Sequence, residues 1–306
     1  MHSGGGSGGG GGGSGGEDEQ LWFVAQGLAR RKAREEAVTA RKQQQQEEQS
    51  TREKAGPEQQ AAGAAPWPPP PAEWSHAAAR QALQLAAGLT GLILLPAALT
   101  PGALASPRPW LLFAAYFTFF FGGSVRRVLR HGPLAPRASD AQRAGAGGRA
   151  ALAAFIAAMP LIHWLPLMRH HGALAALPPD AAAAHGGLAL YDLLGAALIA
   201  GAIKLNWSAA AALGAAYDRV VAPPRLVTEG PYALVQHPIY GSYMLLFAGY
   251  CLACHSAPFA LLAAWACGLY YTRRAGLERD VLRAAFGGAY DDYALRTPRR
   301  FIPWVV

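Results

Sequence analysis

The stretch "PIYGSYMLLFAGYCLACHSAPFALLAAWACGLYY", residues 238–271, contains no Asp, Glu, Lys or Arg over its 34 positions. A single helix of that length would rise about 51 Å, far more than the roughly 30 Å of bilayer hydrocarbon. Two antiparallel helices fit this thickness better, and the polar break from His255 to Pro258 offers a place for the turn between them. We therefore predict a membrane-embedded helical hairpin that turns near residues 255–258.

Four further blocks of the chain are almost free of charge: residues 82–99, 110–125, 150–168 and 186–203. About 18 residues in a helix rise about 27 Å, so each block is a candidate membrane span, and the 110–125 block is a short one. The alternation typical of strands is absent from the sequence. We predict an all-α fold, a polytopic membrane helix bundle with a C-terminal helical hairpin and a cytosolic tail.

Asp192 lies inside the fourth of these blocks. An ionised carboxylate in a membrane span costs about 2.5 to 3.5 kcal/mol on insertion scales. We therefore expect Asp192 to face the interior of the bundle, where it either pairs with Lys204 or Tyr191 or contacts a substrate.

The net charge of +8 is distributed unevenly between the loops. The first loop holds Arg108 and the third holds Arg169, whereas the second loop holds Arg126, Arg127, Arg130, Arg137, Arg143 and Arg149. The fourth loop is basic as well, with Lys204, Arg219 and Arg225. By the positive-inside rule, both termini are cytosolic, and membrane topology accounts for the charge without nucleic-acid binding. We expect the endoplasmic reticulum membrane, with another organelle membrane as the alternative.

Residues 1–76 combine a Gly-rich start, a Gln run and a Pro-rich end, and we expect a disordered cytosolic tail there. The segment "LWFVAQGLARRKAREEA" within it is an alternative amphipathic helix that touches the membrane surface. Residues 77–306 are predicted to form the membrane domain.

Metal and haem sites are not favoured by the remaining motifs. The histidines His163, His170, His171 and His185 lack acidic or cysteine companions at metal-ligand spacing, so we expect no metal. "CLACH", residues 251–255, matches the haem attachment pattern, but it lies inside an apolar run. We interpret its cysteines as small core residues.

The loop before the hairpin reads "LVTEGPYALVQHPIY", residues 226–240. Gly230 and Pro231 form a turn signal, and Pro238 suits the first turn of a helix, where its missing amide hydrogen would be unpaired anyway. Tyr232, His237 and Tyr240 therefore gather at a turn and a helix start. A helix N-terminus attracts anionic groups, although the tyrosines and the histidine could equally be interfacial anchors.

After the hairpin, Arg274 and Glu278 stand four residues apart on one face of a helix that leaves the membrane. A surface ion pair at this spacing stabilises a helix by only a few tenths of a kcal/mol. The pair is therefore more informative as a cation and an acceptor placed together above a membrane pocket.

These elements in this order, followed by Phe286-Gly287 and by Tyr290-x-x-Tyr293, resemble the C-terminal half of the isoprenylcysteine carboxyl methyltransferase family. The wider group of that family includes phospholipid N-methyltransferases, and the resemblance covers residues 213–303. The sequence departs from the family pattern at Gln236, where Arg is usual, at Arg279, where a second Glu is usual, and at Tyr217, where a polar residue is usual.

The resemblance implies that S-adenosylmethionine binds at the cytosolic mouth of the bundle. It implies cofactor contacts from Arg225, Leu226, Val227, Tyr232, His237, Pro238, Ile239, Tyr240 and Glu278. It further implies that Arg274 holds the methyl-accepting group, so that Arg274 and Glu278 are the candidate catalytic residues. The acceptor is expected to be lipidic or prenylated and to enter from the bilayer, among the surrounding membrane lipids.

Two acceptor classes stay open. A carboxylate with a pKa of about 3.5 is already ionised at neutral pH, so it needs a cation such as Arg274 and no base. A phospholipid amine must lose a proton, which Glu278 or Tyr240 would have to accept.

Two other functions compete with methyl transfer. The ending "RRFIPWVV" is similar to that of NADPH-dependent sterol and steroid reductases, but those commonly have Asn where Ile239 precedes Tyr240. A non-catalytic scaffold that binds anionic lipid would account for the basic loops, but not for the ordered pairs His237-Tyr240 and Arg274-Glu278.

Overall fold

The structure is a computed structural model that describes residues 72–133, 137–174, 188–216, 223 and 225–302. These residues belong to one compact unit, Pro70–Val306. The candidate amphipathic helix, the tail up to residue 71, His185 and Tyr217 lie outside the described residues.

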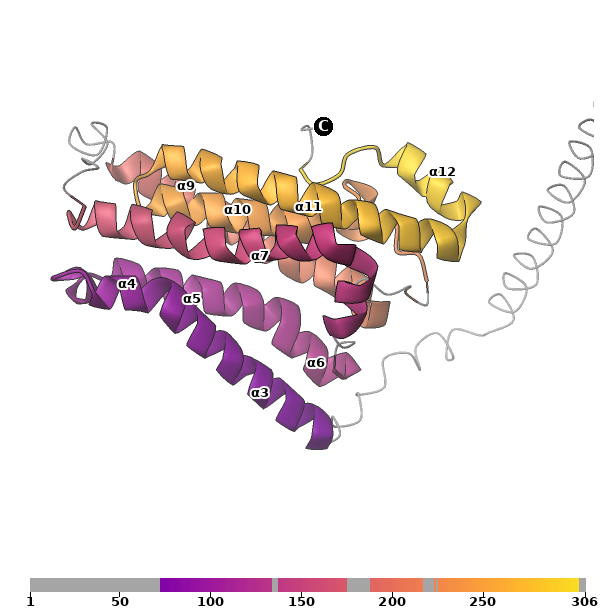
Figure 1. Cartoon of the computed structure of the whole chain (residues 1–306), viewed down its shortest axis with the longest axis horizontal. Coiled ribbons are helices and arrows are strands. Elements are labelled where there is room, and N and C mark those ends of the chain that lie inside the picture. The colour runs from indigo at the N-terminus through magenta and orange to yellow at the C-terminus, as the bar shows by residue number, and fades with distance from the viewer. Residues whose placement is uncertain (1–71, 134–136, 175–187, 217–222, 224, 303–306) are drawn as a thin grey trace, which may run out of the picture. The chain divides into compact units, whose positions relative to one another are not determined.

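Two long helical segments open the described chain (Figure 1). The first runs from α3 (Ala72–Leu89) through a π-helical turn, η2 (Thr90–Leu94), into α4 (Leu95–Ala98). After a short 3₁₀ turn, η3 (Ala103–Ala105), the second runs from α5 (Arg108–Phe120) through a second π-helical turn, η4 (Phe121–Val125), into α6 (Arg126–His131). Both segments extend beyond the apolar blocks from which they were predicted.

The π-helical turn η4 coincides with a close approach to a neighbouring helix. A methyl group added at Gly122 would overlap the ring of Trp207, and one added at Gly123 would overlap the amide oxygen of Asn206. Small residues allow membrane helices to approach each other closely. The paired glycines therefore let the α5–α6 segment lie against α9 (Leu188–Leu213).

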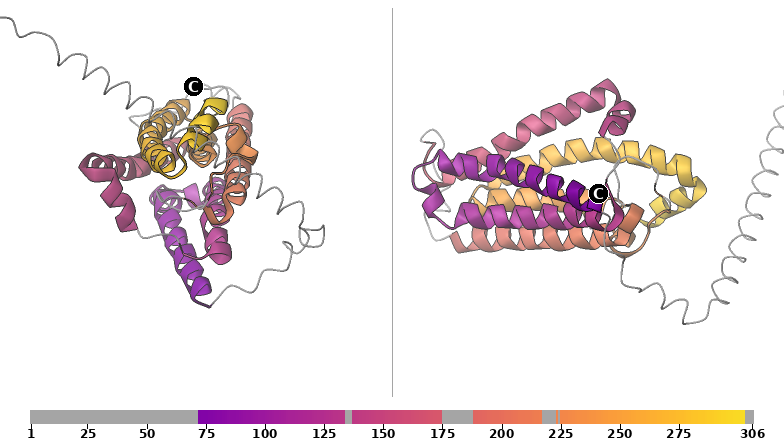
Figure 2. Two further views of the ribbon diagram at one scale, coloured as in Figure 1. Left: turned by 90° about the vertical axis from the view of Figure 1, so that its right-hand side faces the viewer. Right: turned by 90° about the horizontal axis from the view of Figure 1, so that it is seen from below.

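The remaining helices are α7 (Arg137–His170), α9, α10 (Pro238–Ala253), α11 (Ala257–Phe286) and α12 (Gly288–Arg296). Short 3₁₀ turns, η5 (Gly214–Ala216) and η6 (Gly230–Ala233), occur between α9 and α10. Helix α10 packs against both α9 and α11, and α11 packs against α7 (Figures 1 and 2). Within α7, Gly145 has a φ of 62°, which breaks the helix before its apolar part.

Within the residues that the structure describes, three helices are long and apolar enough to cross a membrane: Ala72–Ala98, Gly145–His170 and Leu190–Leu213. Helix α10 is apolar but shorter. The described chain contains helices and no strand, so the predicted all-α membrane bundle is confirmed.

The predicted hairpin is also confirmed. Helix α10 ends at Ala253 and α11 begins at Ala257, and His255 between them adopts the left-handed conformation with a φ of 54°. The 30 residues of α11 rise about 45 Å, more than the hydrocarbon thickness. We therefore infer that the outer part of α11, which carries Arg274 and Glu278, would reach the edge of the hydrocarbon region when the hairpin lies in a bilayer.

Glycines let the two central helices, α9 and α10, pack backbone against backbone. A methyl group at Gly195 would lie 2.7 Å from the backbone nitrogen of Ala253, and one at Gly249 would lie 3.0 Å from the carbonyl oxygen of Gly195. Both distances are shorter than ordinary van der Waals contacts. These two glycines therefore set the distance between the helix that precedes the loop and the helix that follows it.

A buried histidine fills the core between α5, α7 and α10. The His163 ring lies 2.9 Å from the Tyr116 hydroxyl through Nε2 and 2.8 Å from the Met159 carbonyl through Nδ1. The Tyr250 hydroxyl donates to the backbone carbonyl of His163 at 3.1 Å. Both ring nitrogens therefore have partners within the core, which agrees with His163 as a packing residue of a Pro-containing helix.

Asp192 has different partners from those expected. Its Oδ1 atom lies 2.8 Å from Arg108 Nη1 and 3.0 Å from His255 Nε2. The two pairings considered from the sequence, with Lys204 or with Tyr191, are both wrong, since Arg108 and His255 are the partners. Lys204 lies 12 residues further along the same helix, about 18 Å away along the axis. Asp192 instead links α9 to the start of α5 and to the hairpin turn.

Candidate functional site

The loop that enters α10 is anchored on the end of α9. Val227 and Tyr232 are buried in a small apolar cluster with Ala209, against which Leu213 and Ile239 also pack. Gly230 has a φ of 60°, a backbone conformation that glycine adopts without strain, and it begins the 3₁₀ turn η6. The turn signal in the sequence therefore forms a turn whose apolar side chains fix the loop on α9.

Helix α10 begins directly after this loop. Pro238 occupies its first turn, and the residue before it, His237, makes no side-chain capping hydrogen bond to the helix. The first N–H groups of a helix lack partners within that helix, and they carry partial positive charge. This start places His237 and Tyr240 one turn apart.

Four side chains from α10 and α11 meet at this point, and we call them the four-residue cluster: His237, Tyr240, Arg274 and Glu278. The Tyr240 hydroxyl donates to Glu278 Oε1 and accepts a hydrogen bond from Arg274 Nε at 3.2 Å. The Nδ1 atom of His237 lies 3.3 Å from Glu278 Oε2. Arg274 Nε lies 3.9 Å from Glu278 Oε1. The two motifs that lie far apart in the sequence thus form one polar cluster.

The cluster is partly shielded from solvent. The side chain of His237 is 8% exposed, whereas those of Arg274 and Glu278 are 21% and 25% exposed. Charged hydrogen bonds gain strength where water is partly excluded, but a small molecule can still reach groups with this exposure. The cation and the carboxylate are therefore held in place and remain accessible.

A stack of rings fixes the orientation of Tyr240. Its ring lies 4.6 Å from that of Tyr271 at an interplanar angle of 14°, and the His237 ring lies 5.6 Å away at 19°. Tyr271 was not among the site residues predicted from the sequence. Its spacing is a usable signal, because Tyr271, Arg274 and Glu278 follow each other at i, i+3 and i+7 on one face of α11.

The segment that follows α12 crosses the start of α10, and we call residues 297–302 the C-terminal strap. The backbone N–H groups of Gln236 and His237 donate to the carbonyls of Arg299 and Arg300 at 2.8 and 2.7 Å. The side-chain amide of Gln236 donates to the Thr297 carbonyl at 2.8 Å. Gln236, which stands where the family usually has Arg, therefore holds the C-terminal strap against the start of α10 through both its backbone and its side chain.

The strap brings one more ring to the cluster. The Phe301 ring centroid lies 6.0 Å from that of His237 and 6.5 Å from that of Tyr240. This approach depends on Gly241, because a methyl group there would overlap the Phe301 carbonyl. Phe301 was not among the site residues predicted from the sequence, although a glycine directly after Tyr240 is a signal of close backbone approach.

Helix α12 connects the strap to the loop (Figure 1). The Tyr293 hydroxyl donates to the Tyr232 carbonyl at 2.9 Å. Burial raises the pKa of the Tyr293 phenol, so the phenol keeps its proton and stays a donor at physiological pH. The second tyrosine of the Tyr-x-x-Tyr motif therefore has a structural role, because it holds α12 against the loop.

The predicted cofactor residues Arg225, Leu226 and Val227 are not part of the four-residue cluster, and neither is Arg279, where the sequence departs from the family pattern. The contacts that the structure describes for the Arg225 side chain are to Glu229, at 3.0 Å, and to the Ala212 carbonyl, at 3.4 Å. Arg279 pairs with Asp280 at 3.8 Å on the surface. Leu226 is half-buried in the loop beside Val227. The predicted cofactor contacts of residues 225–227, which rest on their main chain, stay a prediction.

Residues 190–289 match the family model for phospholipid methyltransferases. No curated protein matches the chain at a significant level. The matched segment contains all of α10 and α11, nearly all of α9, and all four residues of the cluster, and it supports a membrane methyltransferase. This match covers 100 of the 306 residues, and it agrees with the wider membrane group that the resemblance indicated.

Proposed function

We propose that this protein is a membrane-embedded, S-adenosylmethionine-dependent methyltransferase that acts on a lipidic acceptor. The observation that carries the proposal is the four-residue cluster, in which His237 and Tyr240 at the start of α10 contact Arg274 and Glu278 on α11. This cluster lies within the segment that matches the methyltransferase family. We further propose that it faces the cytosol, as the distribution of basic residues predicts.

The chemistry of the cluster fits the proposed cofactor. S-adenosylmethionine carries an ammonium, a carboxylate and a sulfonium, and when bound it supplies an electrophilic methyl group. The Glu278 carboxylate suits the ammonium, since its two oxygens offer about four acceptor positions. The N–H groups in the first turn of α10 suit the carboxylate. The rings of Tyr240 and Phe301 suit a cation, which aromatic faces attract.

Arg274 is proposed to orient the acceptor. Its guanidinium is held by the Tyr240 hydroxyl at 3.2 Å, and Tyr240 is in turn held by its stack on Tyr271. A charged group fixed in this way positions a reactant better than a flexible one. Tyr240 is proposed to connect acceptor binding with cofactor binding. Its hydroxyl contacts both Arg274, which is proposed to hold the acceptor, and Glu278, which is proposed to hold the cofactor.

The first candidate acceptor is the carboxylate of a prenylated cysteine. A carboxylate is ionised at neutral pH, so Arg274 would hold it without any group acting as a base. The second candidate is a phospholipid amine, which the description of the matched family favours. That acceptor requires Glu278 or Tyr240 to take a proton.

Radiolabelled methyl transfer tests the proposal directly. Purified protein in lipid nanodiscs is incubated with methyl-labelled S-adenosylmethionine and with either farnesylcysteine or phosphatidylethanolamine. Label in farnesylcysteine supports the carboxylate acceptor, and label in the phospholipid supports the amine. An alkylammonium has a pKa near 10, so transfer to the amine should rise with pH between about 7 and 9, whereas transfer to the carboxylate should not. Reduction of a sterol with NADPH, or no reaction with either acceptor, would count against the proposal.

A further inference from the structure

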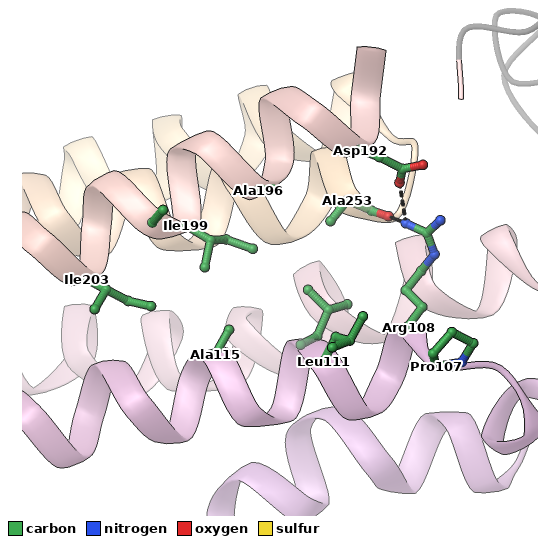
Figure 3. Close-up of a pocket in the computed structure, with 11 residues that line it drawn as sticks. Pro107, Arg108, Leu111, Ala115, Asp192, Ala196, Ile199, Ile203 and Ala253 are labelled. Carbon is green, nitrogen blue, oxygen red and sulfur yellow. Dashed lines mark hydrogen bonds and ion pairs between the residues drawn. The ribbon is translucent and has the colours of Figure 1, made fainter. Parts of the chain in front are cut away.

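A groove of about 460 Å³ lies between α5 and α9 (Figure 3), and none of the four-residue cluster lines it. It is lined by Pro107, Arg108, Leu111, Leu112, Ala115, Asp192, Ala196, Ile199, Ala200, Ile203 and Ala253. Its volume is in the range of cavities that hold small organic ligands. Most of its walls belong to two apolar helices, so a ligand would enter from the hydrocarbon of the bilayer.

The polar side chains of the groove are confined to one end. Arg108 and Asp192 lie together there, and the walls beyond them are aliphatic (Figure 3). The Arg108 guanidinium also donates to the Ala253 carbonyl, and Asp192 also contacts His255 in the hairpin turn. Arg108 begins α5 and Asp192 lies near the start of α9, so both charges stand where the helices approach the membrane interface.

This end of the groove is remote from the proposed methyl-transfer site. Ala253 follows Tyr240 by 13 residues on α10, which corresponds to about 20 Å along the helix axis. A headgroup bound at Arg108 therefore cannot also contact the four-residue cluster. The groove is a separate feature of the fold, and the inference drawn from it does not depend on the proposed function.

We propose that this groove binds a zwitterionic phospholipid, with one acyl chain along the aliphatic walls and the headgroup at the Arg108–Asp192 pair. A phosphate matches the guanidinium, and an ammonium matches the carboxylate, whose side chain is 43% exposed and can be reached. An anionic headgroup would bring a second negative charge to Asp192. A cationic amphiphile would oppose Arg108 in the same way.

Photo-crosslinking tests this assignment. The full chain is reconstituted in phosphatidylcholine nanodiscs that contain a trace of phosphatidylcholine with a diazirine on one acyl chain, and the labelled residues are mapped by mass spectrometry. Labels should concentrate on groove residues of α5 and α9, with yields at least fivefold above those on the outward-facing residues of α3. Label spread evenly over all membrane helices would overturn the proposal.

Two variants fill the groove from opposite walls, Ala200→Phe from α9 and Ala115→Phe from α5. Each should lower groove labelling at least fivefold. The matched control is Leu193→Phe, which lies on α9 but not in the groove and whose side chain is 68% exposed. Labelling within twofold of wild type in all three folded variants would contradict the proposal, and size-exclusion elution identifies a variant that fails to fold.

Competition separates the headgroup classes. When phosphatidylethanolamine replaces phosphatidylcholine as the host lipid of the nanodisc, groove labelling by the trace probe should stay the same. When phosphatidylglycerol is the host lipid, groove labelling should rise at least fivefold, because phosphatidylglycerol competes less well with the zwitterionic probe. Equal competition by phosphatidylglycerol, or by a free fatty acid, would assign the groove to the acyl chain alone and overturn the proposed role of the Arg108–Asp192 pair.

Discussion

The hydroxyl of Tyr240 donates a hydrogen bond to the carboxylate of Glu278, a residue 38 positions further along the chain. This bond joins the first turn of α10 to the outer part of α11. The hairpin makes the contact feasible, because two antiparallel helices with a short turn bring their distant ends together. The same tyrosine accepts a hydrogen bond from Arg274, so one phenol connects a cation and an anion.

The substitution Tyr240→Phe should keep the ring stack on Tyr271 and remove both hydrogen bonds. A hydrogen bond to a charged group contributes about 1.5 to 3 kcal/mol, so we expect methyl transfer to fall by about tenfold or more. The rate of label transfer under saturating substrate measures this. Tyr290→Phe is the control, because the buried Tyr290 hydroxyl has no hydrogen-bond partner in the described structure. Equal rates in both variants would contradict the role given to Tyr240.

The substitution Arg274→Ala should impair turnover more than cofactor binding. The guanidinium is proposed to hold the acceptor, and Glu278 keeps its contacts with His237 and Tyr240 without it. We expect at least a tenfold loss in kcat/KM for the acceptor, with the cofactor Kd within about threefold of wild type. Arg279→Ala serves as the control, since Arg279 pairs with Asp280 on the surface. If the cofactor Kd rises by the same factor as kcat/KM falls, Arg274 contributes to cofactor binding and not to holding the acceptor.

The C-terminal strap predicts a strong effect at Gly241. An alanine methyl would overlap the Phe301 carbonyl, and such overpacking costs about 1 to 3 kcal/mol. The melting temperature in detergent should therefore fall by several degrees, and methyl transfer should fall with it. Gly268→Ala is a matched control within the same hairpin, because open space surrounds that position, and its melting temperature should stay or rise. If Gly241→Ala melts like wild type, the strap does not cross α10 as described.

The contact between α9 and α10 predicts a similar contrast within a single helix. Gly195→Ala should destabilise the protein by about 1 to 3 kcal/mol, because the methyl would lie 2.7 Å from the backbone nitrogen of Ala253. Gly201→Ala, six residues further along α9, meets nothing within 4 Å and should be neutral or stabilising. Thermal unfolding of the two purified variants measures the difference. Similar melting temperatures would argue against the tight packing of these two helices.

The membrane helices and the hairpin were predictable because hydropathy and length alone define them. The meeting of the loop at residues 226–240 with Arg274 and Glu278 was predicted with help from the resemblance. The strap was not predictable, since Gln236 and His237 bind backbone carbonyls that carry no sequence signature. The partner of Asp192 was missed for a different reason: Arg108 lies 84 residues away, and only the packing of α5 against α9 selects it over closer cations.

The most direct test of the central claim is a calorimetric titration of the purified protein with S-adenosylmethionine, repeated with Glu278→Gln and with NADPH. We expect wild type to bind S-adenosylmethionine, and Glu278→Gln to weaken binding by at least tenfold because the carboxylate charge is lost. Glu229→Gln, which alters an exposed carboxylate paired with Arg225, should bind as wild type does. Binding of NADPH in place of S-adenosylmethionine, or unchanged affinity in Glu278→Gln, would contradict the assignment of this site.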